Sequence, residues 1–447
     1  MENKQLMKNL TMIVIPIAAQ NLLSALVSAS DALMLGGLNQ DSLSAVSLAT
    51  QVTFIINMFY VGLTNGTTVL SAQYWGKGLK DKVEDILNLA MRYTAIVSTL
   101  FWFLSLFFPS MLMKIFTNDP TLIALGVRYL RPVSWSYLCM GITQIYLCIM
   151  KNTGRTLRST IYGTVALISN LILNALLIYG LLGFPKLEIE GAALATAISR
   201  ILELLLIVYE TRKENVVKIQ PRKFVHINKI LNKDFITYTA PLLTNQLAWG
   251  CGFAMFSVII GHLGTDAVAA NSIANIVKNI IICVCMGLAA GTGIVVGNEL
   301  GKGHLEEARA LGDKLSRLSI ITGAISGIVL LLCRPLIFSM ASTLSVQAKD
   351  YLDIMLYICS YYIIGKSINS TVIGGIFPAG GATKFGMICD TITMWAVVVP
   401  IGLIAAFVLK LPVLWVYFLL NTDEIIKLPA VYWYSKKYRW VKNITKE

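Results

Sequence analysis

The sequence has few of the residues that most enzymes use for catalysis. Its 447 residues include only three histidines, and neither an H-E-x-x-H nor a G-x-S-x-G motif occurs. The nearest approach to a phosphate-binding loop, Gly297 to Gly303, has the wrong spacing and no Ser or Thr after its lysine. We therefore expect no enzymatic activity, no ATP hydrolysis and no bound cofactor. A polytopic membrane enzyme or receptor would need clustered His and Asp ligands or a nucleophile–base pair, and the sequence contains neither pattern.

Charged residues are also scarce, at 14% of the chain against 56% hydrophobic residues, and the mean hydropathy is +0.69. The apolar runs are longer than the roughly 20 residues that cross a bilayer. They predict an all-α integral membrane protein with twelve transmembrane helices. The runs lie at approximately 9–35, 43–72, 88–108, 121–150, 158–182, 190–211, 234–262, 267–298, 310–336, 348–376, 383–409 and 411–435.

Basic residues predict the orientation of the chain. About 25 of them fall in the loops or termini on one side of the twelve runs, and about five fall on the other side. Because Lys and Arg concentrate in cytoplasmic loops, we expect both termini in the cytoplasm of a multi-pass protein of the inner cell membrane. The net charge of +13 is then a topology signal, and no nucleic-acid partner is expected. We expect a monomer whose partner is the lipid bilayer.

Cysteine gives no framework for disulfides. All eight cysteines lie within or at the ends of apolar runs, which is typical of free, buried thiols. Cys283 and Cys285 are two residues apart on a predicted helix and therefore point in different directions. We expect no metal site there.

The chain contains an internal repeat with an offset of 225 residues and no gap. A shared offset over about sixty residues indicates duplicated halves, as many secondary transporters have. Six runs in each half give the halves parallel topology. We predict an N-terminal lobe at 1–211, a basic cytoplasmic linker at 212–233 and a C-terminal lobe at 234–447. The matching positions are Pro16 and Pro241, Asp41 and Asp266, Ala45 and Ala270, Gly62 and Gly287, Gly66 and Gly291, and Gly76-Lys77-Gly78 and Gly301-Lys302-Gly303.

Several short segments spread along the chain form a combined pattern. They are Asp31-Ala-Leu-Met-Leu-Gly36, Gln73-Tyr-Trp-Gly76-Lys-Gly78, Gly191-Ala-Ala-Leu-Ala-Thr196, Gly287-Leu-Ala-Ala-Gly291, Gly297-Asn298 and Asp423-Glu424 with Lys427. In this pattern, across essentially its whole length, the chain resembles the multidrug and toxic compound extrusion (MATE) family of cation-coupled antiporters. The resemblance implies two six-helix lobes that form a V around a central drug cavity, with a cation site in a lobe. It also implies export of small organic compounds across the cytoplasmic membrane in exchange for H⁺ or Na⁺ by alternating access.

Asp31 is the first candidate for coupling. An ionised carboxylate in a transmembrane helix is costly, so it should face a bundle interior or water, and the family's coupling aspartate matches this position. Asn170 and Asn174 lie one turn apart on the fifth run, and Asn174 lies at a depth comparable to Asp31. Amide oxygens beside a carboxylate suit Na⁺ or a protonated acid, so these residues predict a cation site. The alternatives are a solvated aspartate at the rim and asparagines that only join helices.

A second candidate group lies on the sixth run. Thr196, Arg200 and Glu203 are spaced so that Arg200 is near both of the others. We interpret Arg200 and Glu203 as a structural salt bridge, with a relay that responds to Asp31 as the alternative.

The second half differs from the first at the coupling position, because Asp31 matches Phe256. It carries Lys278, Lys366 and Asp390 inside predicted helices instead, and we expect Lys366 to pair with Asp390. Lysines facing the cavity would favour anionic or zwitterionic compounds, whereas the alternative is snorkelling along their own helices. Aromatic, amide and methionine side chains are predicted to line the cavity, with plain packing as the alternative. These are Tyr137, Gln246, Trp249, Met255 and Trp395, together with Met286 and Met394.

A flippase for lipid-linked saccharides of the same superfamily is the alternative function. It predicts a more basic cavity, and Lys278 and Lys366 keep this alternative open. The twelve predicted helices and the match at Asp31 favour the antiporter.

Overall fold

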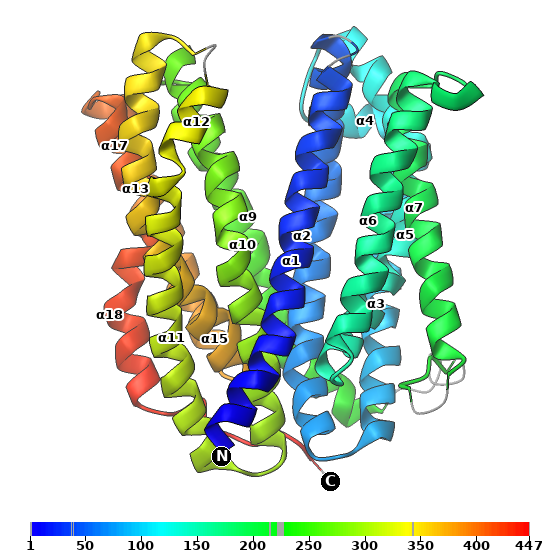
Figure 1. The fold of residues 1–447 in the computed structure, drawn as a ribbon, viewed down its shortest axis with the longest axis vertical. Coiled ribbons are helices and arrows are strands. Elements are labelled where there is room, and N and C mark those ends of the chain that lie inside the picture. The colour runs from blue at the N-terminus through cyan, green and yellow to red at the C-terminus, as the bar shows by residue number, and fades with distance from the viewer. Residues whose placement is uncertain are drawn as a thin grey trace. The chain divides into compact units, whose positions relative to one another are not determined.

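The computed structural model describes residues 2–36, 38, 40–213, 216–220, 228–341 and 344–446, and these are helical or irregular, with no strand among them (Figure 1). The predicted all-α class is confirmed. The first half contains α1 (Glu2–Gly36), α2 (Gln40–Gly76), α3 (Lys80–Phe107), α4 (Pro109–Lys114), α5 (Pro120–Asn152), α6 (Thr156–Tyr179), the 3₁₀ turn η1 (Leu181–Gly183) and α7 (Glu188–Thr211).

The second half is more interrupted. Three π-helical segments, η2, η3 and η4, replace α-helix near prolines. The elements are α9 (Lys229–Gly261), α10 (Thr265–Gly301), α11 (Leu305–Leu332), α12 (Arg334–Met340), α13 (Val346–Thr371), η2 (Val372–Ile376), α14 (Phe377–Ala379), α15 (Thr383–Ile392), η3 (Thr393–Val398), α16 (Val399–Leu403), η4 (Ile404–Val408), α17 (Val413–Leu420) and α18 (Asp423–Lys436).

Helices lie at all twelve predicted runs, and ten of the described helical stretches are long and apolar enough to cross a membrane. The helices at the other two runs do not meet this criterion, for reasons that their sequences show. Helix α13 carries four charged residues, and α17 and α18 contain only 8 and 14 residues on either side of the break at Asn421 and Thr422. The count of twelve spans therefore stays a prediction.

Local sequence signals explain where several helices begin and end. Asp119 caps α5 by accepting a hydrogen bond from the backbone N–H of Thr121 at 2.8 Å, and Pro120 follows at the first helical position. Helix α6 ends at Gly180, whose φ of +71° is left-handed and therefore suits glycine.

The chain forms two compact units. Unit 1 comprises Met1–Asn21, Ala72–Gly78 and Ala240–Glu447, and unit 2 comprises Leu22–Ser71 and Leu79–Thr239. The start of α1 and the end of α2 thus group with the second half. The predicted lobes and linker stay a prediction, and positions 214–215 and 221–227 of that linker lie outside the described residues.

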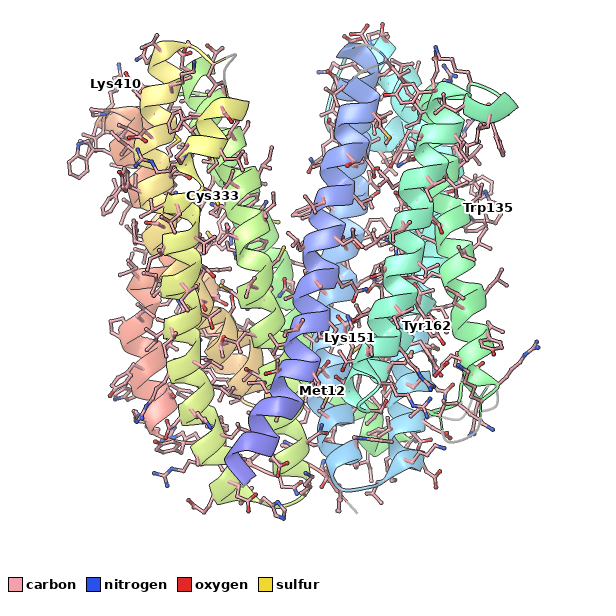
Figure 2. All side chains as sticks on the ribbon, in the orientation of Figure 1. Met12, Trp135, Lys151, Tyr162, Cys333 and Lys410 are labelled. Carbon is pink, nitrogen blue, oxygen red and sulfur yellow. The ribbon has the colours of Figure 1, made fainter. Side chains whose placement is uncertain are left out.

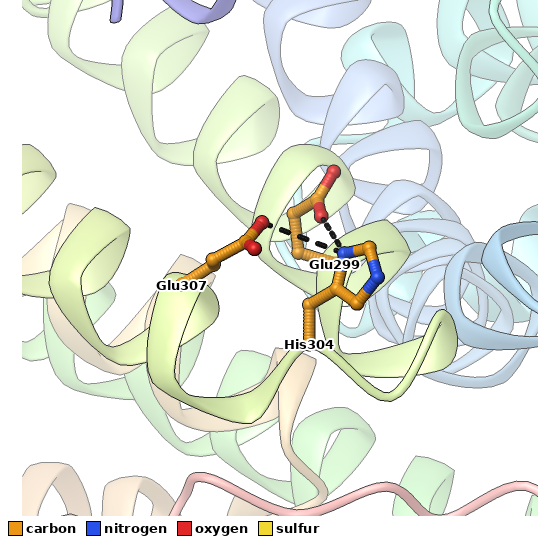
Figure 3. Close-up of side chains that lie close together, drawn as sticks. All are labelled: Glu299, His304 and Glu307. Atoms are coloured by element: carbon orange, nitrogen blue, oxygen red, sulfur yellow. Dashed lines mark hydrogen bonds and ion pairs between the residues drawn. The ribbon is translucent and has the colours of Figure 1, made fainter. Parts of the chain in front are cut away.

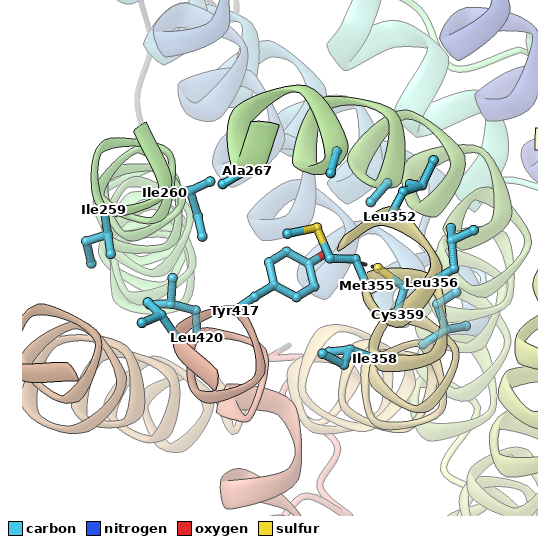
Figure 4. Packing of buried hydrophobic residues seen from close by; sticks show 14 of the residues in the cluster. Ile259, Ile260, Ala267, Leu352, Met355, Leu356, Ile358, Cys359, Tyr417 and Leu420 are labelled. Carbon is cyan, nitrogen blue, oxygen red and sulfur yellow. Dashed lines mark hydrogen bonds between the residues drawn. The ribbon is translucent and has the colours of Figure 1, made fainter. Parts of the chain in front are cut away.

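Each unit has its own apolar core. In unit 1, Tyr417 lies among Ile259, Leu356 and Leu420, and its hydroxyl is 3.1 Å from the thiol of Cys359 (Figure 4). In unit 2 the fully buried aromatic rings include those of Tyr60, Tyr137, Tyr146 and Phe235, and the Tyr60 hydroxyl donates to the backbone carbonyl of Tyr137 at 2.9 Å.

Recurring glycines allow close helix packing. A β-carbon on Gly287 would lie 2.8 Å from the β-carbon of Ala18, and one on Gly291 would lie 2.7 Å from Val14 Cγ2. These glycines therefore let α10 approach α1 within unit 1.

A basic cluster closes one end of unit 2 around the buried carboxylate of Glu210. Arg155 and Arg158 pair with it at 3.0 and 3.1 Å, and Tyr162, labelled in Figure 2, donates to it at 2.6 Å. The hydrogen bond that the ammonium of Lys213 donates to Glu210 raises the pKa of Lys213, so this loop residue stays charged. This is the end that the basic residues assign to the cytoplasm.

Candidate functional site

The structure places Asp31, the first coupling candidate, against α6, the helix at the fifth predicted run. The side-chain amide of Asn174 in α6 donates a hydrogen bond to Oδ1 of Asp31 in α1 at 2.6 Å. Asp31 is partly buried, and Asn174 is 1% exposed. The carboxylate of Asp31 therefore contacts the amide predicted beside it.

The contact continues as a chain of polar side chains through unit 2. Asn174 also donates to Oδ1 of Asn170 at 3.4 Å, and Asn170 donates to the hydroxyl of Thr196 in α7 at 3.3 Å. The hydroxyl of Thr196 donates in turn to the backbone carbonyl of Ala192 at 3.1 Å. Four of the six predicted coupling residues are thus connected from α1 through α6 to α7.

Small residues on α7 make this connection possible. Gly191, Ala192, Ala193, Ala195 and Ala197 are all buried, and a β-carbon on Gly191 would lie 2.5 Å from the carbonyl oxygen of Leu177. Because small residues let helix backbones approach closely, the short Asn and Thr side chains can meet across α6 and α7.

One acceptor at this site has no partner. Oδ1 of Asn174 is buried and makes no hydrogen bond to any described residue. A buried amide oxygen normally has a donor, and this one lies on the same amide that contacts Asp31. A carboxylate and a free amide oxygen form a ligand pair suited to a hard cation or to the proton of a neutral acid.

Arg200 and Glu203 form a separate ion pair. Arg200 Nη1 lies 3.0 Å from Oε2 of the 1%-exposed Glu203, which also accepts a hydrogen bond from Thr143 at 2.8 Å. The predicted salt bridge is confirmed. Within the described part of the chain, the polar chain from Asp31 ends at Ala192, so a relay to Arg200 stays a prediction.

Unit 1 contains a larger buried charge network centred on Lys427 in α18. Its ammonium lies 2.8 Å from Asp390, 3.0 Å from Glu424 and 3.9 Å from Asp423. All three partners are largely buried, and a lone charge among them would be costly. Lys427 thus neutralises carboxylates from both α15 and α18.

The predicted pairing of Lys366 with Asp390 is wrong. Lys366 pairs with Glu424 at 3.1 Å and lies 5.0 Å from the ring centre of Trp249, and Asn369 also donates to Glu424 at 2.8 Å. The reason is that α18 supplies both an acid and a base, so each of the two residues finds its counter-charge there.

Asp390 has a second partner that parallels Asp31. The amide of Asn245 in α9 donates to Oδ2 of Asp390 at 2.8 Å. In unit 2 the acid lies on the first helix of the repeat and the amide on the fifth. In unit 1 the amide lies on the first helix and the acid on the fifth, at positions that do not match those of Asp31 and Asn174 in the repeat.

The remaining predicted cavity residues are divided between the units. Trp249 stacks on Phe253 with ring centres 5.5 Å apart, and the 40%-exposed Trp395 donates from Nε1 to the carbonyl of Ala248 at 3.1 Å. Gln246 and Met255 on α9 are partly buried.

The structure places Tyr137 in the core of unit 2. Its side chain is fully buried, and its hydroxyl lies 2.9 Å from that of Thr53. Of the two accompanying methionines, Met286 is 43% exposed and Met394 is buried.

A small hollow lies beside the network of unit 1. Oδ1 of Asn245 and Oδ1 of Asp423 are buried there without a partner among the described residues. The lining residues are Asn245, Ala248, Trp249, Asp390, Thr393, Met394, Asp423 and Lys427.

Sequence reasoning assigned no role to Asp423, Glu424 and Lys427. A usable signal was present, because the acids precede the lysine by four and three residues within the last apolar run. Charges with that spacing inside a transmembrane helix indicate a paired, buried group.

A surface cluster of possible metal ligands lies where α10 turns into α11 (Figure 3). Nδ1 of His304 lies 3.3 Å from Glu299 and 3.4 Å from Glu307, and Lys302 pairs with Glu299 at 2.6 Å. His304 and Glu307 are exposed, so these contacts are explained as surface ion pairing.

Comparison with known proteins gives a consistent family match. A family model described as MatE matches residues 16–176 and 241–404. The chain is 21% identical to the probable multidrug resistance protein YoeA of Bacillus subtilis, over 98% of this chain and 95% of that protein. It is 23% identical to the probable multidrug resistance protein NorM of Thermotoga maritima, over 100% of this chain and 96% of that protein.

Solved structures share the fold at lower identity. A MOP superfamily transporter from Pyrococcus furiosus superposes with a TM-score of 0.88 at 18% identity, covering 98% of this chain and 97% of that one. The outward-facing conformation of a multidrug resistance MATE family transporter gives the same TM-score and identity, with 97% and 96% covered.

Proposed function

The chain belongs to the MatE family of multidrug and toxic compound extrusion transporters, and from this premise we propose that it is a cation-coupled antiporter. It exports small organic compounds across the cytoplasmic membrane in exchange for H⁺ or Na⁺ by alternating access. The names of its relatives support the substrate class, since YoeA and NorM are both described as probable multidrug resistance proteins.

The observation that carries the proposal is the contact between Asp31 and Asn174. It joins a carboxylate in a transmembrane helix to an amide whose own oxygen has no partner among the described residues. When Asp31 is ionised, the amide donates to it and the site holds one negative charge in a membrane span. A proton or Na⁺ removes that charge, and the free amide oxygen is available as a second ligand.

The same contact explains how ion binding alters the protein. Neutralising Asp31 weakens the charge-assisted hydrogen bond from Asn174, which is a contact between α1 and α6. The Asn170–Thr196 bond extends that contact to α7. An ion that binds one conformation more tightly than the other then shifts the equilibrium between them, and export follows from that difference.

The test is dye transport in vesicles that contain the purified protein. We expect a proton or sodium gradient to drive uptake of the cationic dye rhodamine 123 or of its parent acid, rhodamine 110, by the wild type. Asp31→Asn should abolish the dependence on the gradient. Asp41→Asn is the matched control, because Asp41 is exposed in the same unit. Gradient-driven transport that persists in Asp31→Asn at the wild-type rate would reject the coupling role.

The flippase alternative needs fixed positive charge from Lys278 and Lys366. Glu424 neutralises Lys366 at 3.1 Å, which removes half of that argument. Only Lys278 remains to support it.

A further inference from the structure

Lys278 is a buried ammonium without a counter-charge at contact distance. The residue is 6% exposed on α10, and its Nζ lies 4.9 Å from the ring centre of Tyr362. Among the described residues, no carboxylate lies within 4.0 Å of it, in contrast to Lys366 and Lys427. A cation–π contact compensates a buried ammonium less well than an ion pair does.

The neighbouring acids are held by other lysines. Glu424 lies 3.1 Å from Lys366 and 3.0 Å from Lys427 and also accepts from Asn369. The ammonium at contact distance from Asp423 is that of Lys427, at 3.9 Å. The network around α18 is therefore paired without Lys278.

Lys278 lines a small hollow in unit 1. Asn271 and Asn275 precede it by seven and three residues, so all three lie on one face of α10. The amide of Asn275 donates to Oδ1 of Asn271 at 3.1 Å. The NH₂ group of Asn271 is then a donor on the lining of the same hollow, and Phe253 and Phe256 of α9 supply aromatic lining.

The internal repeat has a neutral residue at the position that matches Lys278. With the offset of 225, Lys278 matches Thr53 and Tyr362 matches Tyr137. In unit 2 the hydroxyls of Thr53 and Tyr137 lie 2.9 Å apart, so a neutral pair occupies the same place. Phe256, which lines the hollow, matches Asp31. Unit 1 therefore has an aromatic ring where unit 2 has an acid, and a base where unit 2 has a neutral hydroxyl.

We infer that Lys278 binds the acidic group of an anionic or zwitterionic substrate. A carboxylate or similar acid would pair with the ammonium and accept from Asn271, and an attached ring would contact Phe253 and Phe256. The inference rests on the proposed export of small organic compounds and names the class of compound.

The test compares two dyes that differ only at a carboxyl group. Rhodamine 110 carries the free acid, and rhodamine 123 is its methyl ester. Fluorescence anisotropy with the purified full-length protein measures the affinity of each. We expect the wild type to bind the acid at least about tenfold more tightly, which corresponds to about 1.4 kcal/mol. Lys278→Met should remove this preference by weakening acid binding alone, and Lys278→Arg should retain it.

Lys384→Met is the matched control, because Lys384 is exposed in the same unit and the variant loses the same charge. Its affinities should equal those of the wild type. The inference is overturned if the wild type binds neither dye, binds both equally, or keeps its preference in Lys278→Met. A Lys278→Met protein that is less stable but still prefers the acid would mean that Lys278 only balances Asp423.

This design distinguishes a failure of the binding inference from a failure of the proposed ion coupling. Asp31→Asn should keep the preference for the acid and lose gradient-driven transport. If transport proves independent of any gradient while the preference depends on Lys278, the proposed coupling is wrong and the inference stands. If transport depends on the gradient but Lys278→Met changes no affinity, the inference alone is wrong.

Discussion

The backbone carbonyl of Gln73 occupies the place where a β-carbon on Gly301 would stand. The converse contact also exists, because the carbonyl of Asn298 occupies the place of a β-carbon on Gly76. These positions match in pairs, since Gln73 and Asn298, like Gly76 and Gly301, are 225 residues apart. The repeated Gly-Lys-Gly segments are thus the ends of two helices that pack on each other symmetrically within unit 1.

This contact predicts that Gly301→Ala destabilises the protein. The added methyl would meet backbone, which cannot rotate away, and overpacking of this kind costs about 1–3 kcal/mol or more. Thermal unfolding of the purified protein measures the effect. Gly374→Ala is the control, because nothing lies within 4 Å of the β-carbon position there. Equal melting temperatures for the two variants would contradict the symmetrical contact.

Along the polar chain of unit 2, substitutions should have graded effects on transport. Asn174→Leu removes the donor to Asp31, and a hydrogen bond to a charged group contributes about 1.5–3 kcal/mol. We expect about 10- to 100-fold weaker dependence of dye uptake on the coupling ion. Thr196→Val removes only the last hydroxyl, so its effect should be several times smaller. A larger effect of Thr196→Val would place the ion elsewhere.

Loss of Lys427 should be severe. Lys427→Met leaves Asp390 and Asp423 buried, with no other cation of the described residues at contact distance, and breaking a buried ion pair on one side costs about 3–5 kcal/mol. Combining it with Asp390→Asn should restore part of the stability. Lys436→Met, which breaks the exposed pair with Asp313, should cost at most about 1 kcal/mol. Thermal unfolding in detergent distinguishes these outcomes.

The predicted orientation can be tested at the two ends of one helical run. The stretch Thr383–Val408 is 26 residues long, about 39 Å at 1.5 Å per residue, which exceeds the roughly 30 Å hydrocarbon core. In a background without the eight native cysteines, Lys410→Cys should react with a membrane-impermeant maleimide added outside intact cells. Lys384→Cys should react only after the membrane is opened. The opposite labelling pattern would mean that the chain has the opposite orientation in the membrane.

Much of the architecture was predictable because it follows from local pattern. Apolar runs of sufficient length locate the helices, and the 225-residue offset marks Gly287 and Gly291, which the structure places against α1. The i, i+3 spacing of Arg200 and Glu203 led directly to their ion pair. Similar depths for Asp31 and Asn174 led to their contact.

The partners of Lys366 and Asp390 were not predictable in this way. Depth along a helix can be counted from the sequence, whereas rotation about the helix axis and the choice of neighbour come from packing between helices. Both residues lie at depths that suit a pair, but α18 provides Glu424 and Lys427 to them instead. When a buried lysine or acid has several possible partners, its actual partner therefore cannot be assigned from spacing alone.

The placement of acid and amide on the helices of the repeat has an evolutionary consequence. With the offset of 225, Asp31 matches Phe256 and Asn245 matches Gln20, so the two acid–amide pairs arose at different positions after the duplication. The halves are no longer interchangeable. A tandem of two first halves would inherit a second Asp31 and place a threonine where Lys278 now stands, so it would lose the positive charge that distinguishes one half from the other.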